Sequence, residues 1–553
     1  MPFARRKAQQ RKAQLKAKAR VSAQKGFVVL DSRLPVAEAG RELLRKPFPE
    51  HWSFLLGELA LYSLLVLIIT GSYLTFFFTP SMMEAPYAGA YTPLQGVPVS
   101  EAYASVLRIS FEVRGGLLIR QMHHWASLVF VAAVAVHMLR IFFTGAFRKP
   151  RESNWLIGVT LFVLAVLEGF CGYSLPDDLL SGTGLRIAQG VFQSIPVFGT
   201  YLTMFIFGGE FPGHIIISRL YALHVLFVPG AIIALVALHL VLVVYLKHTQ
   251  WAGQGKTNSN VVGTPMFPAF TVRSVGLSLT VFGLLAVLGG VAQINPVYVY
   301  GPYRTDQVST ASQPDWYIGF LEGSLRIMPP FETNLWGHTV MWNVLVPAVL
   351  LPGLLFGALY AYPFIERWVT RGTGEHHLCD RPRDRVTRTG LGVAGIVFYA
   401  VLLLAGGNDV LAMTFGISLN VLTWIFRVSL VLAPIVGFLV TKRFCLALQA
   451  HDRERVTKGD PSSEIAQDVQ GGMHEAHLPL TSAQLLPLLV RDLPEPLAIE
   501  TDPEVVPSRR SRLRAALSLW FYRDRVTTPL TPVQQQHVTA VTAPPALAKK
   551  EQE

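Results

Sequence analysis

One stretch of the chain, residues 114–140 with the sequence RGGLLIRQMHHWASLVFVAAVAVHMLR, constrains the possible fold more than any other. It is apolar enough to cross a membrane, yet it contains His123, His124 and His137. On an ideal helix, the step of 14 residues from His123 to His137 returns to within about 40° of the same face, about 21 Å further along the axis. A single buried helix would therefore present two imidazoles on one stripe, one near each membrane surface.

A second apolar stretch, residues 220–246, carries His224 and His239. Ionisable side chains inside a membrane helix are costly and usually functional. A structural role in the core is a reasonable alternative for one such histidine, but it explains two matched pairs poorly. The two helices therefore predict two stacked haems whose ligands are His123, His137, His224 and His239.

Composition places the chain in a membrane. Of its 553 residues, 51% are hydrophobic and 15% are charged, which is too apolar for a soluble protein of this size. The net charge of +12 is concentrated in the N-terminal arm and a few short loops, as expected on a cytoplasmic face. We expect these segments to meet membrane lipid and no nucleic acid. The three scattered cysteines and the lack of a CxxCH motif indicate neither a disulfide framework nor covalent haem.

Hydropathy and loop charge predict an all-α membrane protein with eight transmembrane helices and both termini in the cytoplasm. An amphipathic helix is expected near residues 38–46, and the basic loop RKPR at 148–151 marks an inside connection. The predicted spans are residues 54–78, 117–143, 155–175, 218–246, 275–294, 341–364, 391–405 and 421–441. We divide the chain into a basic N-terminal arm (1–50), a four-helix core that holds two haems (51–250), a C-terminal four-helix region (251–441) and a cytoplasmic tail (442–553).

Glycines in the first and third predicted spans repeat the interval of the histidines. Gly57 and Gly71 are 14 residues apart, and so are Gly158 and Gly172. Glycine lets a bulky group approach the backbone of a membrane helix. Ordinary helix–helix packing is the common alternative, but the shared interval favours contact with the same two haems.

The two histidine intervals differ by one residue. His224 and His239 are 15 residues apart, which rotates the second ligand by about 60° on an ideal helix. Pro229 and Gly230 lie between them. Because proline removes a backbone hydrogen bond, it permits a kink or a locally wider turn that could absorb the extra residue.

These motifs resemble cytochrome b of the respiratory quinol–cytochrome c reductase (cytochrome bc) complex over residues 45–440. The matching segments are LIRQMHHWAS…VHMLR, LYALHVLFVPG…ALHL, GYSLPDD at 172–178 and PDWY at 314–317. The resemblance implies two non-covalent b-type haems, sets His124 aside as a bystander, and matches Arg120 and Arg140 to arginines beside the haem propionates. With the predicted topology, His123 and His224 would hold an outer haem, and His137 and His239 an inner one.

The resemblance also implies a quinol-oxidation site on the outside. Pro314, Asp315, Trp316 and Tyr317 match the family's PEWY signature, with aspartate in place of glutamate. Asp315 is the expected proton acceptor and Tyr317 the hydrogen-bond donor to the quinol. Glu322 lies seven residues beyond Asp315 and is expected to line the same pocket and share its role.

The inside quinone-reduction site is less well matched. Arg273 fits the family's cation in the segment FTVRS, but Ser274 replaces the usual carboxylate. His248 is offset from the family's quinone-site histidine. These two residues, Arg273 and His248, are the candidates for that site.

Within the family, the basic arm, the PDWY variant and the long tail look most like the actinobacterial form, which implies menaquinol as the substrate. The expected partners are a Rieske iron–sulfur subunit, a cytochrome c subunit, a second copy of the complex and a terminal oxidase in a supercomplex. The chain would be a multi-pass protein of the cell membrane that couples quinol oxidation to proton translocation.

Three other classes remain open on the sequence alone. The first is a membrane anchor with two haems from another oxidoreductase, although such anchors usually have fewer spans and lack PDWY. The second is a transporter with structural histidines. The third is a non-catalytic scaffold subunit that has kept the fold.

Overall fold

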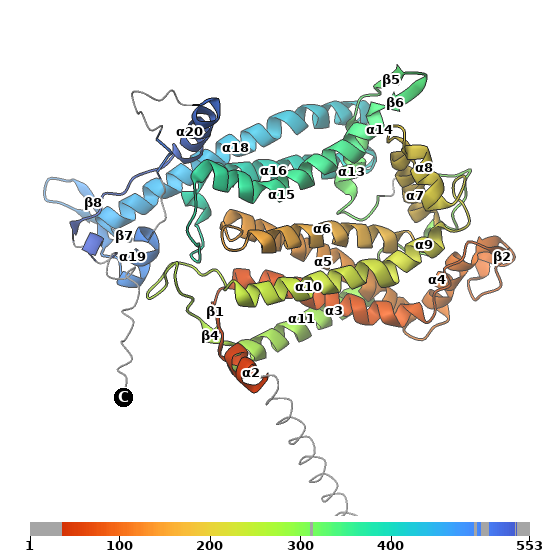
Figure 1. The fold of residues 1–553 in the computed structure, drawn as a ribbon, viewed down its shortest axis with the longest axis horizontal. Helices are drawn as coiled ribbons and strands as arrows, with labels where there is room; N and C mark the ends of the chain where they lie inside the picture. Colours follow the sequence, from red (N-terminus) through yellow and green to blue (C-terminus); the bar gives the residue numbers. More distant parts are fainter. Residues whose placement is uncertain are drawn as a thin grey trace, which may run out of the picture. The chain divides into compact units, whose positions relative to one another are not determined.

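The computed structural model describes residues 36–309, 313–490, 495–498, 508–532, 534–536 and 538. The described part of the chain contains eight helices that are long and apolar enough to cross a membrane, which confirms the predicted all-α membrane class (Figure 1). Their bounds are Trp52–Thr75, Gly116–Phe143, Glu152–Tyr173, Ile216–Tyr245, Met266–Val291, Trp342–Thr370, Val386–Gly406 and Leu419–Lys458. Most of the basic arm, up to residue 35, lies outside the described residues.

Four spans are single helices, and the other four are built from shorter pieces. The main helices of the spans are α3 Leu55–Thr75, α5 Gly116–Phe143, α6 Glu152–Tyr173, α9 Ile216–Ala222 with α10 Val228–Tyr245, α11 Thr271–Val291, α14 Trp342–Leu345 with α15 Leu351–Thr370, α16 Val386–Gly406 and α18 Leu419–Lys458. The helices outside the spans are α2 Val36–Arg45, α4 Glu101–Phe111, α7 Leu179–Gln193, α8 Gly199–Phe207, α12 Val297–Tyr300, α13 Gly319–Ile327, α17 Asn408–Phe415, α19 Ser482–Leu489 and α20 Arg509–Tyr522.

The strands form four small antiparallel pairs. Their bounds are β1 Pro47–Phe48 with β4 Thr264–Pro265, β2 Glu84–Pro86 with β3 Pro98–Ser100, β5 Glu332–Leu335 with β6 His338–Met341, and β7 Asp460–Gln467 with β8 Met473–Leu478.

The chain divides into two compact units. The first comprises Met1–Glu50 and Val262–Gly276, and the second comprises His51–Val261 and Leu277–Glu553. Within the first unit, β1 pairs with β4 and the ring of Phe48 stacks on that of Phe270 with centroids 4.2 Å apart. In the same unit Arg273 forms an exposed ion pair with Glu50 at 2.8 Å.

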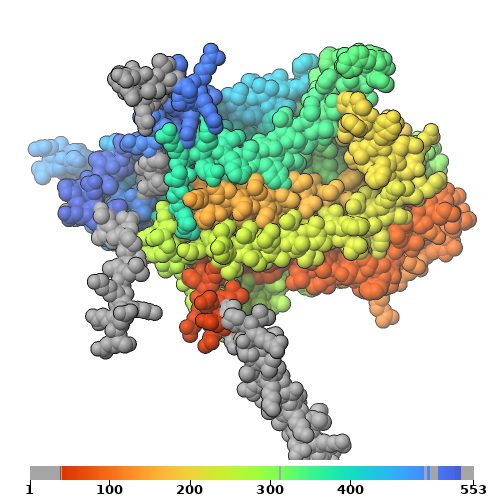
Figure 2. Space-filling view, in the orientation of Figure 1, coloured from red at the N-terminus to blue at the C-terminus, as the bar shows by residue number. Residues whose placement is uncertain are grey.

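In the second unit, α3, α5, α6 and α10 share one apolar cluster. α3 packs along α5, and α6 contacts both α5 and α10. The fourth span lies on the face of the molecule shown in Figure 2. Three of its apolar side chains, Leu226, Phe227 and Val241, are more than half exposed. Because apolar side chains at such positions would be unfavourable in water, this surface is suited to lipid.

The fourth span contains the locally wider turn that Pro229 predicts. Residues Leu223–Phe227, which include His224, form a π-helical turn in which the N–H of Val228 donates to the carbonyl of Leu223. A π turn takes in one more residue than an α-helical turn. The 15-residue interval from His224 to His239 is therefore accommodated without a break in the helix.

The eighth span is longer than predicted. α18 continues to Lys458, whereas hydropathy placed the end of the span at residue 441. Its 40 residues correspond to about 60 Å, about twice the thickness of the hydrocarbon core. The first part of the expected tail is therefore a continuation of a membrane helix.

A buried cluster of charged side chains connects the predicted inside ends of the second, sixth and seventh spans. Asp380 accepts contacts from Arg148, Arg385 and Arg388, and Arg388 also contacts Glu366 at 3.0 Å. Burial opposes ionisation of Asp380, but the three arginines outweigh it and hold its pKa well below its usual range. Each charge has a partner, which burial requires.

The loop after α6 contains a second buried carboxylate, Asp177, whose pKa is raised instead of lowered. Asp177 adopts a left-handed backbone conformation with φ of 54° and is buried. Burial raises its pKa to about 6, despite a hydrogen bond from Ser100 and with a further contribution from Asp178. The following residue, Asp178, accepts a hydrogen bond from the backbone N–H of Ser181 and so caps α7.

Replacing Asp177 with asparagine, which tolerates the left-handed conformation, should stabilise the protein at neutral pH. A carboxyl whose pKa rises from about 3.9 when unfolded to about 6 when folded loses stability as the pH climbs through that window, by at most about 3 kcal/mol. Calorimetry of Asp177→Asn should show a higher unfolding temperature than wild type at pH 7.5, and the gain should shrink at pH 4.5. The exposed Glu332→Gln is the matched control, and a gain independent of pH would contradict the assignment.

Candidate functional site

The structure brings the four predicted ligand histidines together in two pairs. The rings of His123 on α5 and His224 in the fourth span have centroids 6.0 Å apart. Those of His137 on α5 and His239 on α10 are 6.5 Å apart. Two imidazoles that bind one metal from opposite sides, with metal–nitrogen bonds of about 2 Å, have centroids about 6 to 6.5 Å apart. The geometry of both pairs fits one metal between two rings.

The Nδ1 atoms of the outer pair are already engaged by the protein. His123 Nδ1 lies 2.9 Å from the Thr70 hydroxyl, and His224 Nδ1 lies 2.9 Å from a carboxylate oxygen of Glu168. These contacts fix each ring and leave its Nε2 for a metal, which is the usual arrangement of a ligating histidine.

Each of the four predicted glycines faces one of these histidines. A Cβ atom added to Gly71 would lie 3.1 Å from Cε1 of His123, and one added to Gly57 would lie 3.1 Å from Cε1 of His137. The corresponding distances are 2.5 Å from Gly172 to His224 and 4.0 Å from Gly158 to His239. A side chain at the first three positions would crowd the ring, so glycine is needed where the two pairs meet α3 and α6.

A cavity of about 480 Å³ surrounds the outer pair. Its walls include His123, His224 and Arg120, and it extends to His124 and Asp315. The outer histidine pair and the carboxylate of the PDWY segment thus line one continuous space.

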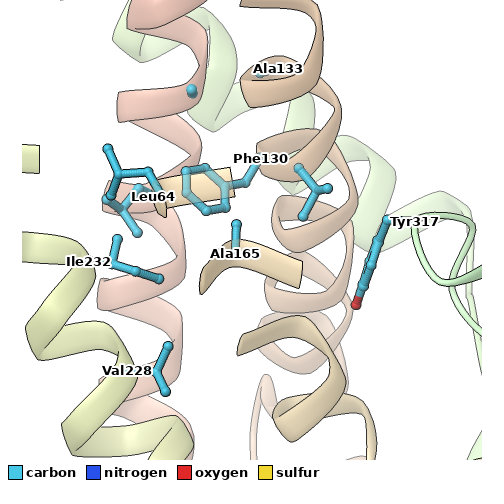
Figure 3. Packing of buried hydrophobic residues seen from close by; sticks show 10 residues of the cluster. Leu64, Phe130, Ala133, Ala165, Val228, Ile232 and Tyr317 are labelled. Atoms are coloured by element: carbon cyan, nitrogen blue, oxygen red, sulfur yellow. The ribbon is translucent and has the colours of Figure 1, made fainter. Parts of the chain in front are cut away.

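An apolar cluster separates the two histidine pairs. It includes Leu64, Phe130, Ala165 and Ile232, which lie between the helices of the core (Figure 3). Phe130 is midway in sequence between His123 and His137, and its side chain is buried. The same four residues line the outer cavity, so its wall is apolar on this side.

The two predicted propionate partners lie near opposite ends of α5. Arg120 lines the outer cavity and donates a hydrogen bond to the carbonyl of Asn295 at 3.1 Å. Arg140 lies 4.3 Å above the ring of Phe54 and 3.5 Å from the thiol sulfur of Cys379. Arg120 therefore faces the space beside the outer histidine pair, whereas the contacts of Arg140 are with Phe54 and Cys379.

The PDWY segment forms a compact hydrogen-bonded group. Asp315 places one carboxylate oxygen 2.9 Å from Nε2 of His124 and accepts a hydrogen bond from the Tyr317 hydroxyl at 2.9 Å on the other. Burial and the neighbouring Asp315 raise the pKa of Tyr317 well above its usual value, so this hydroxyl remains a donor. His124, set aside as a bystander to haem ligation, is the partner of the candidate proton acceptor.

The other members of the motif support this group. Trp316 packs against the apolar cluster, and its ring lies 5.9 Å from that of Tyr317. Pro314 precedes Asp315 and is half-buried. Neither side chain contributes a polar group to the cavity.

Glu322 is placed differently from the prediction. Its carboxylate binds Arg326, which in turn contacts Asp409 at 2.9 Å. Among the described residues that line the outer cavity, Asp315 is present and Glu322 is not. Burial raises the pKa of Glu322 even though Arg326 opposes the shift. Glu322 lies on α13, where its carboxylate faces Arg326.

The two candidates for the inside site fall in different units. Arg273 belongs to the first unit, where it pairs with Glu50. His248 belongs to the second, where its ring lies 6.4 Å from that of Phe54.

Two further residues of the second unit, His51 and Trp251, are candidates for the predicted inside site. The rings of His51 and Trp251 are 5.3 Å apart, and Nδ1 of His51 contacts the Ser53 hydroxyl at 2.8 Å. Burial, with the charges of Arg140 and Lys256, lowers the pKa of His51. No sequence motif pointed to His51 or Trp251, because they lie in polar flanking segments about 200 residues apart.

Comparison with known proteins adds an independent observation. A family model described as "Cytochrome b(N-terminal)/b6/petB" matches residues 128–302. A relative from Streptomyces coelicolor, named cytochrome bc1 complex cytochrome b subunit, is 51% identical over 91% of this chain and 93% of its own length. Proteins of the same name from Corynebacterium efficiens and Mycobacterium bovis are 50% and 49% identical, over 82% and 88% of this chain and 83% and 87% of their own lengths.

The fold has a counterpart among solved structures. A chain described as "Hyperthermophilic respiratory Complex III" superimposes with a TM-score of 0.54, covering 74% of this chain and 98% of that chain. At 21% sequence identity, this match is a likeness of fold alone.

Proposed function

Because the chain belongs to the cytochrome b subunits of bc1 complexes, we propose that it oxidises menaquinol at an outer site and passes electrons through two b-type haems to an inner quinone-reduction site. The observation that carries the proposal is the pair of histidine couples at 6.0 and 6.5 Å, each facing glycines of the neighbouring helices. One couple shares its cavity with Asp315.

The residues that would hold the two haems follow from this geometry. His123 and His224 would hold the outer one, with Gly71 and Gly172 giving it access to the backbone. His137 and His239 would hold the inner one, beside Gly57 and Gly158. When bound, the haems would supply one-electron redox chemistry.

At the outer site, Asp315 is the proposed proton acceptor for the quinol. Tyr317 donates to one of its oxygens, and His124 holds the other, so the carboxylate is oriented from both sides. Aspartate is one methylene shorter than glutamate and reaches about 1.5 Å less far, so contact with the quinol is made through a water or a small movement of the segment. Glu322 is a candidate for taking the proton onward, since one of its oxygens is buried with no hydrogen-bond partner among the described residues.

The wider assignment follows the family resemblance. A quinol delivers two electrons, of which one passes to a Rieske iron–sulfur subunit and the other to the haem pair, with protons released outside and taken up inside. A cytochrome c subunit, a second copy of the complex and a terminal oxidase complete the expected assembly in the cell membrane, with both termini cytoplasmic. At the inner site, His248 and Arg273 remain the sequence candidates, and His51 and Trp251 join His248 within the second unit.

Purification of the whole complex tests the proposal. The reduced-minus-oxidised spectrum and a pyridine haemochrome assay should give two b-type haems per chain, and menaquinol should drive reduction of cytochrome c. A complex without haem would favour the transporter class. Haem without quinol-driven cytochrome c reduction would favour a membrane anchor of another oxidoreductase or a scaffold subunit.

Arg140 should raise the reduction potential of the inner haem, because a positive charge near a haem favours its reduced state. Arg140→Leu is therefore expected to lower the midpoint potential of the inner haem while the outer one is unchanged, as measured by redox titration with optical detection. Arg148→Leu, which loses a charge paired with Asp380, is the matched control. Identical inner midpoints in Arg140→Leu and wild type would contradict the role.

A further inference from the structure

A carboxylate near the C-terminal end of α6 contacts one of the four ligand histidines. Glu168 lies on α6, and its Oε1 atom is 2.9 Å from Nδ1 of His224. Both side chains are 18% exposed. The other oxygen, Oε2, is buried and has no hydrogen-bond partner within the described part of the chain. A carboxylate inside a membrane span is costly, so it marks a function rather than a packing role.

Glu168 reaches His224 through two groups. Besides its carboxylate, its backbone carbonyl lies 3.2 Å from the same Nδ1 atom. A backbone carbonyl alone is enough to orient a ligating imidazole. The carboxylate therefore adds something other than orientation, namely a negative charge directly behind the ring.

The four histidines differ in what faces Nδ1. His123 has the neutral hydroxyl of Thr70 at 2.9 Å, and Nδ1 of His137 has no hydrogen-bond partner among the described residues. Of the four, only His224 has a carboxylate within 4.0 Å in the described segments. The carboxylate therefore acts on one ligand of the outer pair and on neither ligand of the inner pair.

We propose that Glu168 is a positioning residue that lowers the reduction potential of the outer haem through its hydrogen bond from His224. The inference rests on the proposed function. A carboxylate that accepts the Nδ1 proton makes the imidazole a stronger electron donor, which stabilises ferric iron relative to ferrous iron. The reduction itself adds one electron to the iron and transfers no proton to Glu168.

The position of Glu168 matches the direction of electron flow. An electron that arrives from the quinol at the outer site moves on to the inner haem when the inner potential is higher. Glu168 lowers the potential at the outer end, while Arg140 adds positive charge at the inner end. The two residues lie on different helices, and both increase the difference in reduction potential between the outer and the inner haem.

The test is a redox titration of the complete complex carrying Glu168→Gln, a nearly isosteric change that removes the charge and keeps an acceptor. At a fixed potential, the ratio of reduced to oxidised outer haem should rise about tenfold, equivalent to about 59 mV for a one-electron couple. The low-field signal of the ferric outer haem in electron paramagnetic resonance should shift with it. The inner haem in the same sample should not change.

Thr70→Val is the matched control at the opposite ligand, because it removes a neutral acceptor from His123. Its effect on the outer midpoint should be clearly smaller than that of Glu168→Gln. Equal shifts in the two variants would overturn the proposal, since any lost hydrogen bond would then account for the result. An unchanged outer midpoint in Glu168→Gln with both haems bound would also overturn it.

If Glu168→Gln loses the outer haem, Glu168→Asp decides the question. This variant keeps the negative charge but holds it further from the ring of His224. A rise in the outer midpoint that is smaller than the one expected for Glu168→Gln supports the proposal, and a wild-type midpoint overturns it. The proposed function fails separately, through a wild-type complex that lacks two b-type haems.

Discussion

Replacing His137 or His239 with alanine should remove the inner haem and leave the outer one in place, whereas replacing His123 or His224 should do the reverse. In the proposed function each haem would depend on two imidazoles, one from α5 and one from the fourth span, so loss of either should weaken its binding. About half of the b-type haem should be lost in each variant. Redox-resolved spectra of the purified complex would identify which haem remains.

His124→Ala is the matched control, since it alters a neighbouring histidine that faces Asp315 rather than another imidazole. Both haems should remain in this variant. If either His137→Ala or His224→Ala kept both haems at full occupancy, the pairing would be wrong.

Replacing Asp315 with asparagine should slow quinol oxidation at the outer site by about a hundredfold, while both haems stay bound. The amide keeps the shape of the side chain but cannot accept the proton, and the hydroxyl of Tyr317 would still have an oxygen to donate to. Single-turnover reduction of the haems by menaquinol, with the inner site blocked, measures this step directly.

Glu322→Gln alone should have a smaller effect, because its carboxylate is held by Arg326 and lies outside the cavity that contains Asp315. The double variant should be slower than either single one if Glu322 receives the proton next. The exposed Glu332→Gln serves as the control. Wild-type rates in the double variant would remove both carboxylates from the proton path.

Features that depend on neighbouring residues could be predicted well from the sequence. The bounds of the first four spans agree with hydropathy and loop charge to within three residues, whereas each of the other four spans has one end that differs from the prediction by five residues or more. The opposition of Gly71 and Gly57 to His123 and His137 follows from their common interval of 14 residues, which places the glycines and the histidines at the same two depths. The wide turn near His224 follows from Pro229 and the extra residue in the interval.

Features that depend on tertiary contacts could not be predicted in this way. His124 meets Asp315 across 191 residues of sequence, and a histidine next to a ligand carries no signal of that partner. α18 extends past the predicted end of its span because its charged C-terminal part is still a good helix former, which hydropathy does not detect. Glu168 lies in an apolar stretch of sequence that gives no sign of its role, and only its contact with His224 in the folded chain identifies it.

The π-helical turn at Leu223–Phe227 also bears on how ligand spacing can change in evolution. An insertion into regular helix rotates everything beyond it by about 100°, which would turn His239 away from α5. A π turn holds one additional residue locally and leaves the flanking helix in phase. Chains with intervals of 14 or 15 residues can therefore present the same two rings, and a single-residue insertion can be inherited without rebuilding either pocket.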